Sequence, residues 1–155
     1  MLKKLLILFI GAPIIVGCVH SKNFQEPGAP KQGVTGIVKE VYGNQMPSPG
    51  MPLPQPRPIK TTVYIYTLTH ISETRQQGLE PFFSKINTRF IDSVVTDTGG
   101  YFRKELPVGK YSLFLKVNGL FFANSYDIEN NIQPVEIEAR KWTEVKISLN
   151  HKAVY

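Results

Sequence analysis

The chain has 155 residues, of which 42% are hydrophobic and 19% charged, and its formal net charge is +6. This length favours a single domain, and the charges are scattered without a basic stripe interleaved with aromatic residues, which excludes the usual nucleic-acid-binding patterns. The only cysteine is Cys18, so a disulfide framework within one chain is excluded as well.

The first 17 residues have the features of a secretory signal peptide. Lys3 and Lys4 precede an apolar run from Leu5 to Val16. This run is shorter than the ~20 residues of a transmembrane helix and fits the hydrophobic part of a leader. The run ends in Ile15-Val16-Gly17-Cys18, which resembles the lipobox of bacterial lipoproteins. The resemblance implies cleavage before Cys18 and diacylation of its thiol. The alternative is an uncleaved leader in which Cys18 is only a small apolar residue.

The residues after Cys18 bear on where such a lipoprotein would reside. Val19 is not the aspartate that retains some lipoproteins at the inner membrane, and no acidic cluster of the kind that directs others to the cell surface follows. We therefore expect the lipid anchor to hold the protein on the periplasmic face of the outer membrane. Residues 18–32 are polar, contain Pro27-Gly28 and Pro30, and are predicted to form a flexible tether.

A first strand is predicted from Gly33 to Val41, where Gly36 indicates a bulge or the close approach of another backbone. Prolines at positions 47, 49, 52, 54, 56 and 58 follow, a spacing that opposes helix and strand pairing and favours polyproline II. This stretch, from Gly43 to Lys60, is either a ligand for an aromatic-lined groove or a stiff loop over the edge of a sheet, and we favour the loop.

Thr61 to Thr69 is predicted to be a strand because β-branched and aromatic residues occupy most of it. Val63 and Ile65 are expected to face the core, which leaves Tyr64 and Tyr66 on an unusually apolar opposite face.

The stretch from His70 to Arg89 is long for a hairpin connection. Proline at position 81 suits the first turn of a helix, so a single helical turn is predicted at Glu80–Ile86. The stretch is expected either to cover the apolar face or to act as a binding lid, and covering is favoured. The binding alternative assigns a candidate partner-contact surface, which consists of Tyr64, Tyr66, Arg75, Phe82, Phe83 and Arg89.

The stretch from Thr96 to Gly119 is predicted to contain three antiparallel strands joined by two tight turns. In its last strand, Leu113 and Leu115 are expected to face the core and Lys116 the opposite side. Asn118-Gly119 is a strong signal for a two-residue hairpin. Two closing strands are expected around Val135–Ile137 and Val145–Leu149.

About eight short strands with frequent turns indicate an all-β fold, a single antiparallel β-sandwich over residues 33–150 with a short tail at 151–155. The motifs Gly33-Val34-Thr35-Gly36, Thr96-Asp97-Thr98-Gly99-Gly100-Tyr101-Phe102 and Leu106-Pro107-Val108-Gly109 look like those of a carboxypeptidase regulatory-like domain. That resemblance implies a transthyretin-like or Ig-like Greek-key sandwich of seven to eight strands, which in this family is a non-catalytic module and also occurs as small lipoproteins.

Motifs for catalysis and metal binding are absent from the sequence. The three histidines lie far apart, and no metal-ligand spacing, nucleophile elbow or nucleotide-binding loop is present. We therefore expect no enzymatic activity, no metal and no cofactor. The predicted function is a lipid-anchored binding or assembly module of the cell envelope, with the membrane and an envelope protein or glycan as partners. The alternative is a structural pilus-like or adhesin subunit.

Overall fold

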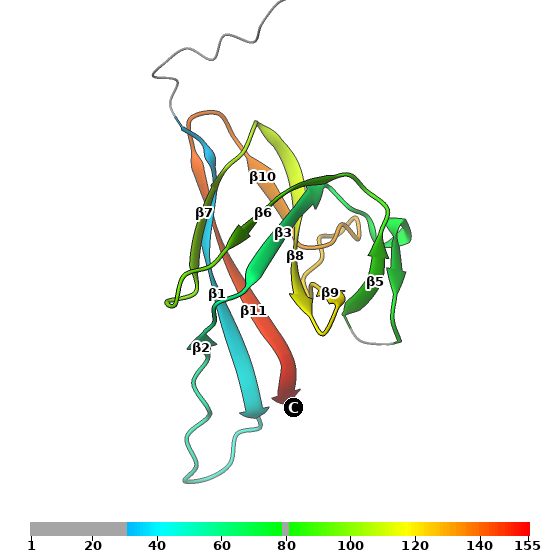
Figure 1. Cartoon of the computed structure of the whole chain (residues 1–155). Helices are drawn as coiled ribbons and strands as arrows, with labels where there is room; N and C mark the ends of the chain where they lie inside the picture. Colours follow the sequence, from blue (N-terminus) through cyan, green and yellow to red (C-terminus); the bar gives the residue numbers. More distant parts are fainter. Residues whose placement is uncertain (1–30, 79–80) are drawn as a thin grey trace, which may run out of the picture.

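The computed structural model describes residues 31–78 and 81–155, so the leader, Cys18 and most of the predicted tether lie outside the described residues. The described chain forms a β-sandwich of a four-stranded and a seven-stranded sheet, with one 3-10 turn and no α-helix (Figure 1). The predicted all-β sandwich is confirmed. Within these residues, no helix has the length and hydrophobicity needed to cross a membrane.

Eleven strands and one 3-10 turn make up the two sheets. They are β1 (Gly33–Asn44), β2 (Arg57–Pro58), β3 (Thr62–Thr67), η1 (Ile71–Glu73), β4 (Thr74–Gln76), β5 (Phe82–Ile86), β6 (Phe90–Val95), β7 (Tyr101–Glu105), β8 (Gly109–Val117), β9 (Leu120–Phe122), β10 (Pro134–Ile137) and β11 (Trp142–Val154). In the four-stranded sheet, β1 pairs with β11, β7 and β2. The seven-stranded sheet has the order β4-β5-β9-β8-β3-β6, with β10 also on β8.

The longest pairing joins β1 to β11, and these two strands are parallel, from Gly33 opposite Trp142 to Asn44 opposite Val154. This corrects the expectation that all pairs would be antiparallel. Gly36 lies where the backbones come closest, since a Cβ atom on it would sit 2.3 Å from the carbonyl oxygen of Val145. The predicted close approach at this glycine is confirmed. The lower ends of β1 and β11 extend beyond the other strands (Figure 1).

The stretch from Thr96 to Gly119 differs in its pairing from the prediction. It holds two strands rather than three, because β6 already ends at Val95. β7 pairs with β1 in one sheet whereas β8 pairs with β3 in the other, so the predicted three-stranded arrangement is wrong. The turns before and after β7 cross from sheet to sheet. Thr96 and Leu106, which are 1% and 4% exposed, anchor these crossings inside the sandwich. The Thr96 hydroxyl donates to the carbonyl of Ile59 and accepts from the amide of Thr61. The Asn118-Gly119 hairpin is confirmed between β8 and β9.

The main core lies between the two sheets. Val63, Ile65, Leu113 and Leu115 point into it as the alternation predicted, because their strands follow a period of two. The closing strands contribute as expected, with these residues buried: Val135, Ile137, Ile147 and Leu149.

A second apolar cluster covers the outer face of the seven-stranded sheet. Its buried members are Tyr66, Phe83, Phe114, Ala123 and Ile132, with Tyr64, Ile71, Ile86 and Phe121 packed against them. Part of this cover is β5, so the helical turn predicted at Glu80–Ile86 is wrong over residues 82–86. The strand is favoured there because alternation sends Phe83 into the second cluster and Phe82 toward the main core.

Candidate functional site

Two of the six residues predicted to contact a partner are buried. The side chains of Phe83 and Tyr66 are 0% and 9% exposed. The Tyr66 ring makes edge-on contacts with Phe114 and Phe121, at centroid distances of 5.6 and 5.8 Å, and burial raises the pKa of its phenol. These residues stabilise the second cluster and cannot themselves touch a partner.

The other four predicted contact residues do not form an apolar patch. Tyr64 is half-buried with its ring edge-on to Phe121, and Phe82 packs against Phe122. Arg75 and Arg89 are exposed, but the apolar surface that they were expected to rim is covered by the chain itself. In the described part of residues 70–89, Ile71, Phe83 and Ile86 cover the outer face of the seven-stranded sheet, which confirms the favoured expectation for that part. A contact role for these four residues stays a prediction.

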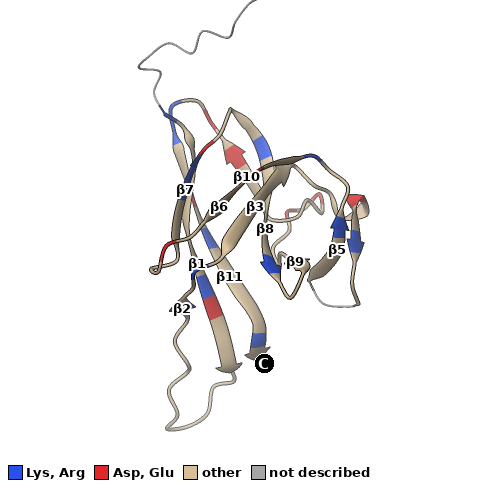
Figure 2. Cartoon of the chain, in the orientation of Figure 1, with Lys and Arg blue, Asp and Glu red and all other residues tan. Residues whose placement is uncertain are grey.

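A segment with several exposed apolar residues lies elsewhere, in the loop that leaves the end of β1. We call residues 45–56 the proline-rich tip. Residues 41–56 contain no Lys, Arg, Asp, Glu or His, and Figure 2 shows this loop free of charge-bearing residues. Met46, Met51 and Leu53 are 49%, 74% and 40% exposed. Apolar side chains exposed together on a soluble domain usually mark an interaction surface.

The tip is tied to the end of β11 by its backbone. The amide of Gln45 donates to the carbonyl of Val154 at 2.8 Å. Val154 and Tyr155 are 59% and 69% exposed, so they add apolar surface next to the tip. The end of the molecule therefore presents uncharged groups from two separate parts of the chain.

A carboxylate holds the base of the tip in place. Glu40 on β1 has only 6% of its side chain exposed, yet it binds two cations: Oε2 accepts from the Arg57 guanidinium at 2.7 Å and Oε1 from the Lys152 ammonium at 2.9 Å. Hydrogen bonds from Lys152 and then Arg57 lower the pKa of Glu40. The guanidinium also lies 4.5 Å over the Tyr42 ring. We call this group the Glu40 clasp, and it joins β1, β2 and β11.

The Glu40 clasp was not predicted from the sequence, although the position of Glu40 on β1 could have indicated it. Val34, Gly36 and Val38 alternate on the inward face of β1, and Glu40 occupies the next inward position. A charged residue on a core-facing position is rarely buried without a partner. That position therefore predicts a counter-charge, even though it does not say which residue supplies it.

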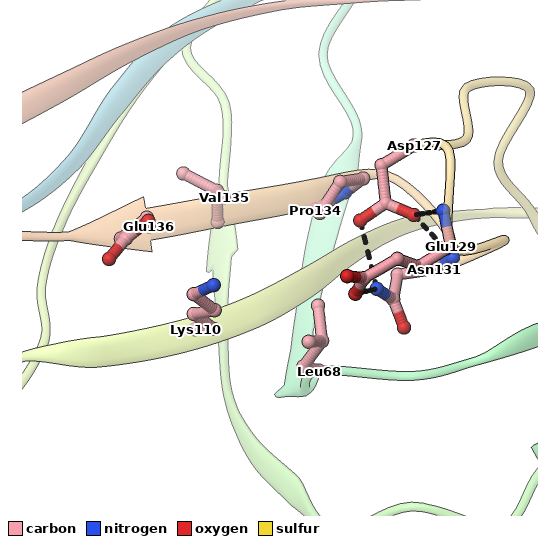
Figure 3. A pocket seen from close by; sticks show the side chains of 8 residues that line it. All are labelled: Leu68, Lys110, Asp127, Glu129, Asn131, Pro134, Val135 and Glu136. Atoms are coloured by element: carbon pink, nitrogen blue, oxygen red, sulfur yellow. Dashed lines mark hydrogen bonds between the residues drawn. The ribbon is translucent and has the colours of Figure 1, made fainter.

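A pocket of about 270 Å³ opens on the seven-stranded sheet, between β8, β10 and the turn that precedes β10 (Figure 3). Asp127 builds one wall: its Oδ1 accepts from the amides of Glu129 and Asn131 at 2.9 and 2.8 Å, and its Oδ2 from Asn131 Nδ2. These bonds, led by the one from the Asn131 side chain, lower the pKa of Asp127. The carboxylate of Asp127 therefore stabilises the turn at residues 127–131.

Two charged residues that line the pocket face each other without forming an ion pair. Glu136 on β10 lies directly opposite Lys110 on β8 in the strand register, yet no salt bridge joins them in the described part of the chain. The lining includes no serine, threonine, cysteine or histidine. Among residues 31–78 and 81–155, no group of acidic, histidine or cysteine side chains is arranged to hold a metal ion. The pocket thus presents charged and amide groups to any molecule that enters it.

Comparison with known proteins gives little beyond the fold. No family model matches the chain, and no curated protein matches it. A solved structure with a related arrangement is GBS52, the minor pilin of the gram-positive pathogen Streptococcus agalactiae, at 18% identity and a TM-score of 0.42. The similarity covers 79% of this chain and 45% of that one, so this chain spans less than half the pilin's length. These values carry no argument about family or function, and the resemblance to carboxypeptidase regulatory-like domains stays a prediction.

Proposed function

We propose that this protein is a lipid-anchored, non-enzymatic binding module of the cell envelope, held on the periplasmic face of the outer membrane through Cys18. In this proposal the sandwich is a rigid scaffold and the proline-rich tip is the surface that engages an envelope partner. The partner is an envelope protein or a glycan.

The observation that supports the proposal is the position of the tip relative to the N-terminal segment. The chain enters the sandwich at Gly33, where β1 begins, and reaches the tip at Asn44, where β1 ends (Figure 1). A strand of 12 residues at ~3.3 Å per residue places the tip roughly 36 Å from the point of entry. A protein whose anchor precedes Gly33 would therefore present this uncharged apolar loop at the far end of β1.

The anchoring part of the proposal is tested by Cys18→Ser. We expect this variant either to leave the membrane fraction or to accumulate as a larger, uncleaved precursor, because the acylated thiol is lost. Fractionation with size analysis of the wild-type and variant full chains gives the answer. A mature-sized variant that still sediments with membranes would contradict lipid anchoring.

One observation favours the alternative of a structural, pilus-like or adhesin subunit. β11 is the end strand of its sheet and is 13 residues long, and no described strand pairs with its outer edge. Side-chain contacts touch this strand at separate points: Asn124 Nδ2 donates to the carbonyl of Ser148 at 3.1 Å, and Thr143 Oγ1 donates to the carbonyl of Glu136 at 2.7 Å. Free strand edges can accept a strand from another chain.

The two candidate functions differ in the assembly state that they predict. A structural subunit would be recovered from the envelope as multimers or filaments, whereas a binding module would be recovered as a monomer or in a complex with a different protein. Sedimentation of the full chain extracted in mild detergent separates these results. Homopolymers would replace the proposed function with the alternative.

A further inference from the structure

The proline spacing of residues 51–56 favours an extended, polyproline II-like backbone. We propose that residues 51–56 are recognised by an aromatic-lined groove on a partner protein. This inference rests on the proposed binding function and specifies the chemistry of its partner.

The sequence of the tip restricts its backbone at every position. From Met51 to Pro58, each residue is either a proline or the residue directly before one. Proline fixes φ near −65°, and the residue before a proline is confined to the β and polyproline II regions. Residues 52–56 accordingly adopt no helix, turn or strand. The extended form of this segment is therefore imposed locally, before any partner is present.

Polyproline II has three residues per turn, so positions three apart share an edge. Pro54 and Arg57 share the edge that faces the sandwich: a Cβ atom on Gly43 of β1 would lie 3.4 Å from the Pro54 ring, and Arg57 binds Glu40. Leu53 and Pro56 share another edge and are both exposed. We call these two residues the outer ridge.

The tip is held at both ends, which lowers the entropy lost on binding. At its start, the amide of Met46 donates to Asn44 Oδ1 and the amide of Met51 to the carbonyl of Ser48, at 2.8 and 3.1 Å. At its end, β2 pairs with β1 and the Glu40 clasp fixes Arg57. A rigid extended segment with an apolar ridge matches the mode by which aromatic-lined grooves bind proline-rich sequences.

The charges around the tip favour a protein partner over a lipid surface. Loops and helices that bind membranes combine apolar groups with cations that attract anionic lipids. The tip itself has no cation. At its base, Arg57 and Lys152 are paired with Glu40, and Lys39, which lies opposite Pro58, is a further exposed cation. A membrane contact by the tip would therefore gain little electrostatic attraction, whereas a groove of aromatic rings requires none.

The experiment uses the full chain in cells, with a photo-crosslinking residue at Met51, beside the outer ridge. Val108, a 58% exposed apolar residue in the turn before β8, carries the same probe as the positional control. Pro52→Ala with Pro56→Ala releases the backbone restraint while keeping the tip apolar. Pro107→Ala is the matched control, and equilibrium unfolding of each variant verifies the fold. A synthetic peptide of residues 51–58 serves as competitor in isolated envelopes.

We expect the probe at Met51 to label one protein at or beside aromatic residues, as read by mass spectrometry. Labelling should fall by about tenfold in the double proline variant, because restored freedom in the unbound tip weakens binding. It should be blocked by the peptide and unchanged by Pro107→Ala. Labelling of lipid, labelling no stronger than from Val108, or labelling undiminished by the double variant would each overturn the inference. Membrane fractionation of the same cells tests lipid anchoring separately. If the protein is not anchored, the labelling result still shows whether the tip binds a partner.

Discussion

The proline-rich tip follows directly on strand β1 of the sandwich body, but different physical requirements account for the residues of the two regions. In the body, side chains alternate between the main core and either the second cluster or solvent, and the seven-stranded sheet is covered on both faces over much of its area. In the tip, apolar residues are exposed and nothing is charged. Burial accounts for most apolar residues of the body, although single ones such as Ile128 are exposed there. The tip combines exposed apolar residues with the absence of charge, which is why we propose binding for the tip and stability for the body.

The largest expected effect is in the second cluster, where Phe83→Ala should lower the free energy of unfolding by about 3–5 kcal/mol, the usual cost of removing a buried phenylalanine. Urea denaturation monitored by circular dichroism measures it, with the exposed Lys85→Ala on the same strand as control. Equal, small losses for both variants would show that residues 70–89 are a movable lid rather than part of the body.

A neighbouring pair on β8 tests which side of the strand faces the main core. Leu115→Ala should cost about 2–5 kcal/mol because this side chain is completely buried. Lys116→Ala should cost at most about 1 kcal/mol, since its ammonium is exposed and only lies over the rings of Tyr64 and Phe121. Chemical denaturation of the two variants gives the comparison, and similar losses at both positions would contradict the assigned register.

The boundary between body and tip is tested at the Glu40 clasp. Glu40→Gln should cost about 1–2 kcal/mol at neutral pH, less than a fully buried ion pair because both cations are more than half exposed. The pKa of Glu40 is lowered in the folded state, so its stabilisation is complete above the unfolded value of about 4.3 and disappears as the pH falls through the folded value.

The measurement is the stability difference between the wild type and Glu40→Gln at pH 7 and at successively lower pH values. The difference should shrink on acidification. A difference that stays constant down to pH 2 would mean that the carboxylate charge is not what joins the strands.

The smallest expected effect is in the tip, where Leu53→Ser should change the free energy of unfolding by less than about 0.5 kcal/mol, because Leu53 is exposed and belongs to neither apolar cluster. Thermal unfolding of the variant beside wild type is sufficient. A loss comparable to that at Leu115 would place the tip within the body and remove the distinction between them.

The strand alternation that positions Val63, Ile65, Leu113 and Leu115 was predictable because a period of two is a local property of the sequence. The same pattern showed that Tyr66 lies on an apolar outer face. Residues 70–89, which include Phe83, were favoured as its cover because they follow the strand directly in the chain. The contribution of Ile132 could not be predicted, since this residue is distant in the sequence.

Two further features depended on distant residues and were not predicted. The parallel pairing of β1 with β11 follows from the route by which the chain crosses between the sheets, which no local pattern encodes. The partners of Glu40 come from β2 and β11, far along the sequence in each case. The proline spacing of the tip, in contrast, determines its backbone locally, so that the extended segment was visible from the sequence although its exposed position was not.

The most direct test of the central claim, that the body provides stability and the tip provides binding, is to replace residues 51–56 with glycine and serine in the full chain. Arg57 is kept so that the Glu40 clasp persists. A photo-crosslinking residue at Met46, outside the replaced segment, reports partner contact, and denaturant unfolding reports stability. We predict a free energy of unfolding within about 1 kcal/mol of the unreplaced chain and the loss of crosslinking. Retained crosslinking, or a collapse in stability, would contradict the claim.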